Sequence, residues 1–164
     1  MPSTHAVKPA QKAVKRYYEA LAAYAKQDVD HELAVRSAFQ NLLEETGRRF
    51  GWTLIPELSD TAAGHRIQPD GTFRDDFHMK RGFWEAKDTQ DKLEDEIRKK
   101  IKKGYPLTNT IFEDTQTAHL FQNGKQAMRA LGQIDAMDRQ IDQFVDDLYG
   151  LTDQEIAIAG EATR

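Results

Sequence analysis

The segment Phe83-Trp84-Glu85-Ala86-Lys87-Asp88 is a short apolar run that ends in a carboxylate and an amine two residues apart. Side chains of a β-strand alternate between the two faces of a sheet. Glu85 and Lys87 therefore share one face, and Trp84 and Ala86 share the other. A metal-binding carboxylate beside an ammonium group suits phosphodiester hydrolysis, in which negative charge grows on a phosphate.

The rest of the chain predicts helices around several short strands. Apolar residues at helical spacing indicate helices, and short apolar runs bounded by Pro, Gly or Asn-Gly indicate strands. The helices are expected at 10–24, 30–46, 88–103, 134–148 and from 152 onward. The strands are expected at 52–55, 65–68, 72–79, 83–87, 110–115 and 117–122, with a loop at 59–64 and a tight connection at 80–82. Strands on both sides of one helix imply an α/β sheet.

Three aspartates are candidates to join Glu85. If the chain reverses near residue 80, antiparallel pairing sets Asp75 or Asp76 roughly opposite Glu85, and only one of these two neighbours can share its face. Asp70 stands in a Pro-Asp-Gly sequence, for which a plain turn is the slightly better explanation. An Asp on one strand and a Glu on the next could bind magnesium and leave room for substrate oxygens.

Composition describes a polar chain without thiol chemistry. The 164 residues are 39% hydrophobic, enough for one ordinary core, and contain no run that could span a bilayer or serve as a secretory signal. We therefore expect a cytoplasmic location and no membrane contact. The absence of cysteine excludes disulfides and thiolate metal sites, so oxygen atoms would hold any metal. The net charge is −4, but lysines and arginines cluster between residues 80 and 103.

Glu85-Ala-Lys87 preceded by an aspartate resembles the signature of the PD-(D/E)XK nuclease superfamily. The resemblance implies a restriction-endonuclease-like mixed sheet flanked by helices, of α/β (α+β) class. It also implies Mg²⁺ or Mn²⁺ held by Glu85 with Asp75, or with Asp70, and a water activated by Lys87. The superfamily often adds a helical glutamate, and Glu32 stands where that residue is expected, although a carboxylate in a first helical turn also offsets the helix dipole.

Several longer motifs resemble the N-terminal nuclease region of restriction-modification proteins that carry an adenine-specific DNA methyltransferase in the same chain. These motifs are Gly51-Trp-Thr-Leu-Ile-Pro-Glu57, Pro69-Asp-Gly71, Gly82-Phe-Trp-Glu-Ala-Lys-Asp88, Lys103-Gly-Tyr-Pro106 and Asn109-Thr-Ile-Phe-Glu-Asp114. Methyltransferase motifs do not follow, and 144–156 is instead similar to the far end of such proteins. The chain is therefore an excised piece, an internally deleted relative or a compact stand-alone protein.

The organisation and function that follow are expectations. Residues 1–9 form a flexible tail, 10–128 a nuclease-like domain and 129–164 a C-terminal helical appendage that docks through its apolar stripe. The function is magnesium-dependent DNA endonuclease, with Lys92, Lys99 and Lys103 against the DNA backbone. A methyltransferase or specificity partner would supply target recognition, and a homodimer would cut both strands. The alternative is a catalytically inactive nuclease-fold module for DNA binding or assembly.

Overall fold

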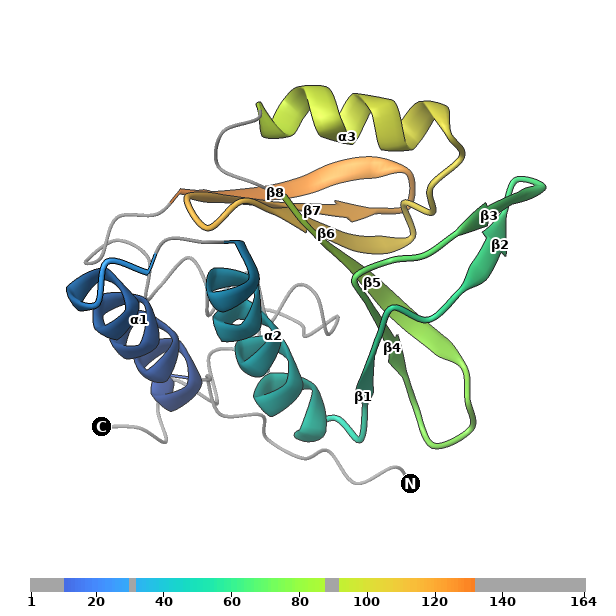
Figure 1. The fold of residues 1–164 in the computed structure, drawn as a ribbon. Helices are drawn as coiled ribbons and strands as arrows, with labels where there is room; N and C mark the ends of the chain where they lie inside the picture. Colours follow the sequence, from blue (N-terminus) through green and yellow to red (C-terminus); the bar gives the residue numbers. More distant parts are fainter. Residues whose placement is uncertain (1–10, 30–31, 88–91, 132–164) are drawn as a thin grey trace.

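The computed structural model describes residues 11–29, 32–87 and 92–131 (Figure 1). Three helices and eight strands lie in these ranges. In chain order they are α1 (Gln11–Lys26), α2 (Glu32–Arg48), β1 (Thr53–Pro56), β2 (Asp60–Ala62), β3 (His65–Ile67), β4 (Gly71–Arg74), β5 (Lys80–Ala86), α3 (Leu93–Lys102), β6 (Asn109–Glu113), β7 (Thr117–Gln122) and β8 (Lys125–Leu131). The predicted N-terminal tail and the helices expected beyond residue 131 lie outside the described residues.

Six of the strands form one mixed sheet in the order β1-β4-β5-β6-β7-β8. Among the described strands, the β5–β6 pair alone is parallel, and α3 makes the crossover between these two strands. The other neighbours in the sheet pair antiparallel. The expected α/β (α+β) class, with a mixed sheet flanked by helices, is therefore confirmed.

The sheet separates two hydrophobic cores, as Figure 1 shows from the placement of α1 and α2 on one side and α3 on the other. The larger core packs α1 and α2, through residues such as Phe39 and Leu42, against Trp84 and Ile111 of the sheet. The smaller core packs Leu93 and Ile97 of α3 against Phe112 and its neighbours. Strand β5 contributes to the first core with Trp84 and turns Glu85 toward α3.

Several boundaries differ from the sequence prediction. The expected loop at 59–64 contains β2, which pairs with β3 in a separate two-stranded sheet. The expected connection at 80–82 is the first part of β5, and the reversal lies at 75–79. Strand β8 was not predicted, because its sequence alternates only weakly between polar and apolar residues. Within the described residues, no helix is long and apolar enough to cross a bilayer.

Candidate active site

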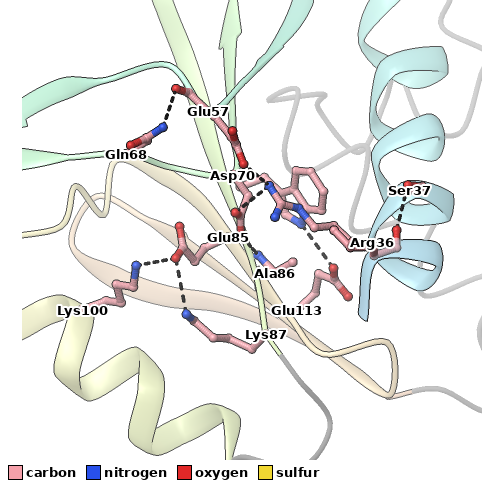
Figure 2. A network of polar contacts seen from close by, with 12 residues as sticks. Arg36, Ser37, Glu57, Gln68, Asp70, Glu85, Ala86, Lys87, Lys100 and Glu113 are labelled. Carbon is pink, nitrogen blue, oxygen red and sulfur yellow. Dashed lines mark hydrogen bonds and ion pairs between the residues drawn. The ribbon is translucent and has the colours of Figure 1, made fainter. Parts of the chain in front are cut away.

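Strand β5 carries its tryptophan and its glutamate on opposite faces. Trp84 is completely buried against α1 and α2, whereas Glu85 is 4% exposed and faces α3. Lys87 follows the strand, and its Nζ lies 3.5 Å from Glu85 Oε1 (Figure 2). The structure thus brings together the carboxylate and the amine that strand alternation places on one face.

Asp70 directly precedes the neighbouring strand β4, level with Glu85 of β5. The register pairs Gly71 of β4 with Trp84 of β5, and the backbone N–H of Ala86 donates to Asp70 Oδ2 at 2.7 Å. Gly71 permits this close approach, because a Cβ there would come within 2.7 Å of Leu54 and 3.0 Å of Trp84. The Pro69-Asp70-Gly71 segment therefore places a carboxylate at the start of β4, beside Glu85 of β5.

Asp70 lies close enough to Glu85 for the charge of Glu85 to act on it. Burial, followed by the negative charge of Glu85, raises the pKa of Asp70. The N–H of Ala86 and the guanidinium of Arg36 offset part of this rise. Arg36 Nη2 lies 2.8 Å from Asp70 Oδ1, and the guanidinium sits 5.9 Å from the centroid of the Trp84 ring. Arg36 therefore ties α2 to the site.

Both oxygens of Glu85 are engaged by residues of α3 and the loop that follows it. Lys100 Nζ donates to Oε1, and the Tyr105 hydroxyl donates to Oε2 at 2.6 Å. Burial and the charge of Glu85 raise the pKa of Tyr105, so its hydroxyl stays protonated and acts as a donor. Lys87 Nζ also lies 3.9 Å from Glu96 Oε2, and the other oxygen of that carboxylate, Oε1, accepts from Lys99 Nζ at 2.5 Å.

The structure does not bring Asp75 or Asp76 to this site. Lys80 already belongs to β5 and pairs with Arg74, so the chain reverses before residue 80 and the two aspartates lie in the turn. The expectation that one of them pairs opposite Glu85 is wrong. The Asp75 carboxylate instead binds groups of its own turn.

The remaining predicted residues lie within or directly beside α2 and α3. Glu32 is the first residue of α2, and its side chain lies outside the described part of the structure. Lys92 directly precedes α3, Lys99 lies in its last turn and Lys103 follows it; all three are exposed. Lys99 is paired with Glu96.

Sequence reasoning missed four residues of the site: Arg36, Lys100, Tyr105 and Glu113. Lys100 stands seven residues after Leu93 and three after Ile97, on the buried face of α3, while Ile101 is 39% exposed. The sequence therefore did contain a sign that Lys100 belongs to the site, namely a lysine on the inward face of a predicted helix. Arg36 likewise precedes Phe39 and Leu43 by one and two helical turns on the inward face of α2.

Glu113 lies behind the site, on the α1–α2 side of the sheet. It is 1% exposed, and burial raises its pKa to about 8. Its side chain accepts from Trp84 Nε1 at 3.4 Å, and its backbone carbonyl accepts from the N–H of Lys87 at 2.7 Å. Glu113 therefore fixes the backbone of Lys87 at the end of the β5–β6 pair. Its signal in the sequence was a charged residue inside a predicted buried strand.

The donor chemistry of Asp70 and Glu85 fits a hard divalent cation. Magnesium is commonly held by one or two carboxylates and keeps several waters. Within the described residues, no group of three or more His, Asp or Glu side chains is arranged as metal ligands. Burial and the negative charge of Glu85 raise the pKa of Asp70, and a cation between the carboxylates would lower it.

Comparison with known proteins gives one informative match. No protein-family model and no curated protein matches the chain. A DrdV–DNA complex determined by cryo-EM superposes with a TM-score of 0.77 and 35% sequence identity over 88% of this chain. The chain spans 14% of the length of that protein.

A second match is more distant. The crystal structure of a candidate nuclease of the DUF820 group from Anabaena variabilis ATCC 29413 shows 13% identity and a TM-score of 0.43. The match covers 69% of this chain and 79% of that one, and it is too distant to bear on function. The sheet topology and the DrdV match together show that the described chain has a restriction-endonuclease-like fold.

Proposed function

We propose that this chain is a magnesium-dependent DNA endonuclease domain in which Asp70 and Glu85 hold the metal. The observation that carries the proposal is that these two carboxylates, one directly before β4 and one in the adjacent strand β5, lie near each other beside the amine of Lys87. Mg²⁺, or Mn²⁺, bound there would supply charge neutralisation at the phosphate and a more acidic water. The 35% identity to a protein solved with DNA supports DNA as the substrate.

In this proposal, some side chains of the site act on the attacking water and others hold the metal-binding carboxylates in position. Lys87, whose side chain is 20% exposed, can orient the attacking water and stabilise the charge that grows on the phosphate oxygens. Arg36 and the N–H of Ala86 fix the Asp70 carboxylate, and Tyr105 fixes that of Glu85. These fixed neighbours hold the carboxylates in place before substrate arrives.

Contacts to the DNA backbone would come from the outer side of α3. Lys92, Lys99 and Lys103 are exposed there and can neutralise phosphates. Such contacts give affinity without sequence preference. Target recognition would therefore come from another part of a larger protein or from a separate specificity or methyltransferase partner of a restriction-modification system. Cleavage of both strands would need a second site, supplied by a homodimer.

Plasmid cleavage with Mg²⁺ tests the proposal directly. Glu85→Gln, Asp70→Asn and Lys87→Met should each lower the cleavage rate by about 10²- to 10⁴-fold, the usual loss when a group that handles charge or protons is removed. Asp75→Asn should cleave like the parent, because its carboxylate serves the turn. Loss of cleavage in Asp75→Asn with retention in Asp70→Asn would move the metal ligand to Asp75.

One observation favours the alternative of an inactive DNA-binding or assembly module. Arg36, Lys87 and Lys100 already neutralise the two carboxylates within the protein. If this neutral arrangement is final, Mg²⁺ and Mn²⁺ should not raise the thermal unfolding temperature of the parent, because a ligand stabilises only the state that binds it. A metal-dependent rise that Glu85→Gln removes would support the endonuclease.

A further inference from the structure

Lys100 occupies an unusual position for a lysine. Its side chain is 22% exposed, on the face of α3 that also buries Leu93 and Ile97. Its Nζ donates to Glu85 Oε1 and lies 4.8 Å from the centroid of the Tyr105 ring (Figure 2 shows the lysine reaching from α3). The ammonium is therefore held between a carboxylate and an aromatic face, both of which attract a cation.

Both oxygens of Glu85 already have partners without a metal, because Lys100 donates to Oε1 and Tyr105 to Oε2. The cations Arg36, Lys87 and Lys100 lie within ion-pair distance of Asp70 and Glu85, and Arg36 and Lys87 also pair with Glu57 and Glu96. A divalent cation bound by Glu85 would therefore lie beside the ammonium of Lys100. Repulsion between like charges at such a half-buried site is costly. At least one of the protein cations must therefore move away or be neutralised when a metal binds.

Lys100 is the cation best placed to move. Arg36 is held by two carboxylates, Asp70 and Glu57, and lies near the Trp84 ring. The backbone of Lys87 is held beside the site, because its N–H donates to the backbone carbonyl of Glu113. Lys100, by contrast, reaches Glu85 from another element through a flexible four-carbon stem, and can swing toward solvent without a backbone change.

We propose that Lys100 is a resident counter-ion of Glu85 that gives way to the metal and then pairs with a phosphate of the DNA. The proposal rests on the proposed function, since it takes Glu85 as a metal ligand. Metal and DNA should accordingly bind with positive cooperativity: the phosphate accepts the ammonium that the metal displaces, and each ligand raises the affinity for the other by the same factor. In the absence of DNA, Lys100 keeps the metal affinity low.

Calorimetric titration with Mn²⁺ in the absence of DNA tests the first half of this proposal. Lys100→Met removes the charge and keeps the length of the side chain, so it should bind Mn²⁺ about 5-fold more tightly than the parent, or better. Lys100→Gln, which keeps a hydrogen-bond donor for Glu85, should show the same direction if the Met variant folds poorly. Lys102→Met, at an exposed position of the same helix, is the matched control and should match the parent.

Binding of a short DNA duplex tests the second half. Measured in a Lys87→Met background, so that the DNA stays intact, Lys100→Met should weaken binding in the presence of Mn²⁺ and reduce the slope of log K against log salt by about 1. An unchanged or lower Mn²⁺ affinity in both Lys100 variants would overturn the proposal. So would a tighter Mn²⁺ site with unchanged DNA affinity and salt slope.

Glu85→Gln separates this proposal from the proposed function. If Glu85→Gln abolishes Mn²⁺ binding and the Lys100 variants do not strengthen it, the counter-ion role fails and the metal site stands. If Glu85→Gln binds Mn²⁺ as tightly as the parent, Glu85 is not a ligand and both proposals fail. Unfolding temperatures without metal establish that each variant is folded before its affinity is compared.

Discussion

Glu113 is an acid held away from water, and it makes the stability of the protein depend on pH. Its side chain accepts from Trp84 Nε1 and, at 2.8 Å, from the N–H of Thr115. Burial is the largest cause that raises its pKa from 4.5 to about 8, and the charges of Asp114 and Asp70 add to it. The folded state holds this proton more tightly than the unfolded chain does. Protonation of Glu113 therefore stabilises the folded state fully below pH 4.5, and this stabilisation is lost as the pH rises toward 8.

Urea denaturation at a series of pH values measures this effect. The free energy of unfolding of the parent should fall between the two pKa values by up to about 1.4 kcal/mol per pH unit from this group. Glu113→Gln should remove that part of the slope, whatever its absolute stability. Glu19→Gln, at an exposed position of α1, should keep the parent slope. Equal slopes in the parent and Glu113→Gln would contradict the buried proton.

At the scale of elements, the turn between β4 and β5 determines which aspartate reaches the site. Asp75 Oδ1 accepts the backbone N–H groups of Phe77 and Met79, each at 2.9 Å. Asp75 Oδ2 accepts two bonds from the Arg81 guanidinium, at 2.8 and 2.6 Å. Asp75 therefore acts as the organiser of a five-residue reversal at 75–79, and this reversal sets the register of β5 against β4.

Thermal unfolding of turn variants checks this role. Asp75→Ala should lower the unfolding temperature, because two backbone donors and Arg81 lose their acceptor. Asp75→Asn should lower it less, since its side-chain oxygen can still accept the two backbone N–H groups. The Mn²⁺ affinity of both variants should equal that of the parent. A large loss of Mn²⁺ affinity in Asp75→Asn would show that the turn serves the metal site as well.

At the scale of the whole molecule, one sheet joins two cores that lie on opposite faces. Phe39 is 6% exposed in the α1–α2 core, and Phe112 is fully buried in the α3 core. Strand β5 supplies Trp84 to the α1–α2 core, and its Glu85 accepts from Tyr105 of the α3 core. Loss of either core should therefore unfold the strand that carries Glu85. The molecule is therefore expected to unfold as one unit.

Truncation of either phenylalanine tests this cooperativity. Phe39→Ala and Phe112→Ala should each lower the free energy of unfolding by about 3–5 kcal/mol, the usual cost of removing a buried aromatic ring. Leu33→Ala, with Leu33 68% exposed, should stay within about 0.5 kcal/mol of the parent. Tryptophan fluorescence and far-UV circular dichroism should report one coincident transition. Separate transitions would show that the cores unfold independently.

Patterns that depend on local spacing were predictable. The alternation along β5 placed Glu85 and Lys87 on one face and Trp84 on the other, and the helical periodicity of α1 and α2 matched their observed bounds closely. The short strand β2 escaped prediction because three residues give no usable period. Local preference decides these features, since a side chain's face follows from the backbone conformation alone.

The sequence by itself determined the α/β class and the Glu-Ala-Lys strand, because both follow from periodicities of two and 3.6 residues. Tertiary structure alone decided that Asp70 meets Glu85 and that Asp75 does not, because shifting the turn by a few residues changes every cross-strand partner. It also decided that Arg36, Lys100 and Tyr105 surround the carboxylates. Contacts between distant segments depend on how α2 and α3 pack on the sheet, and no spacing within the chain encodes that packing.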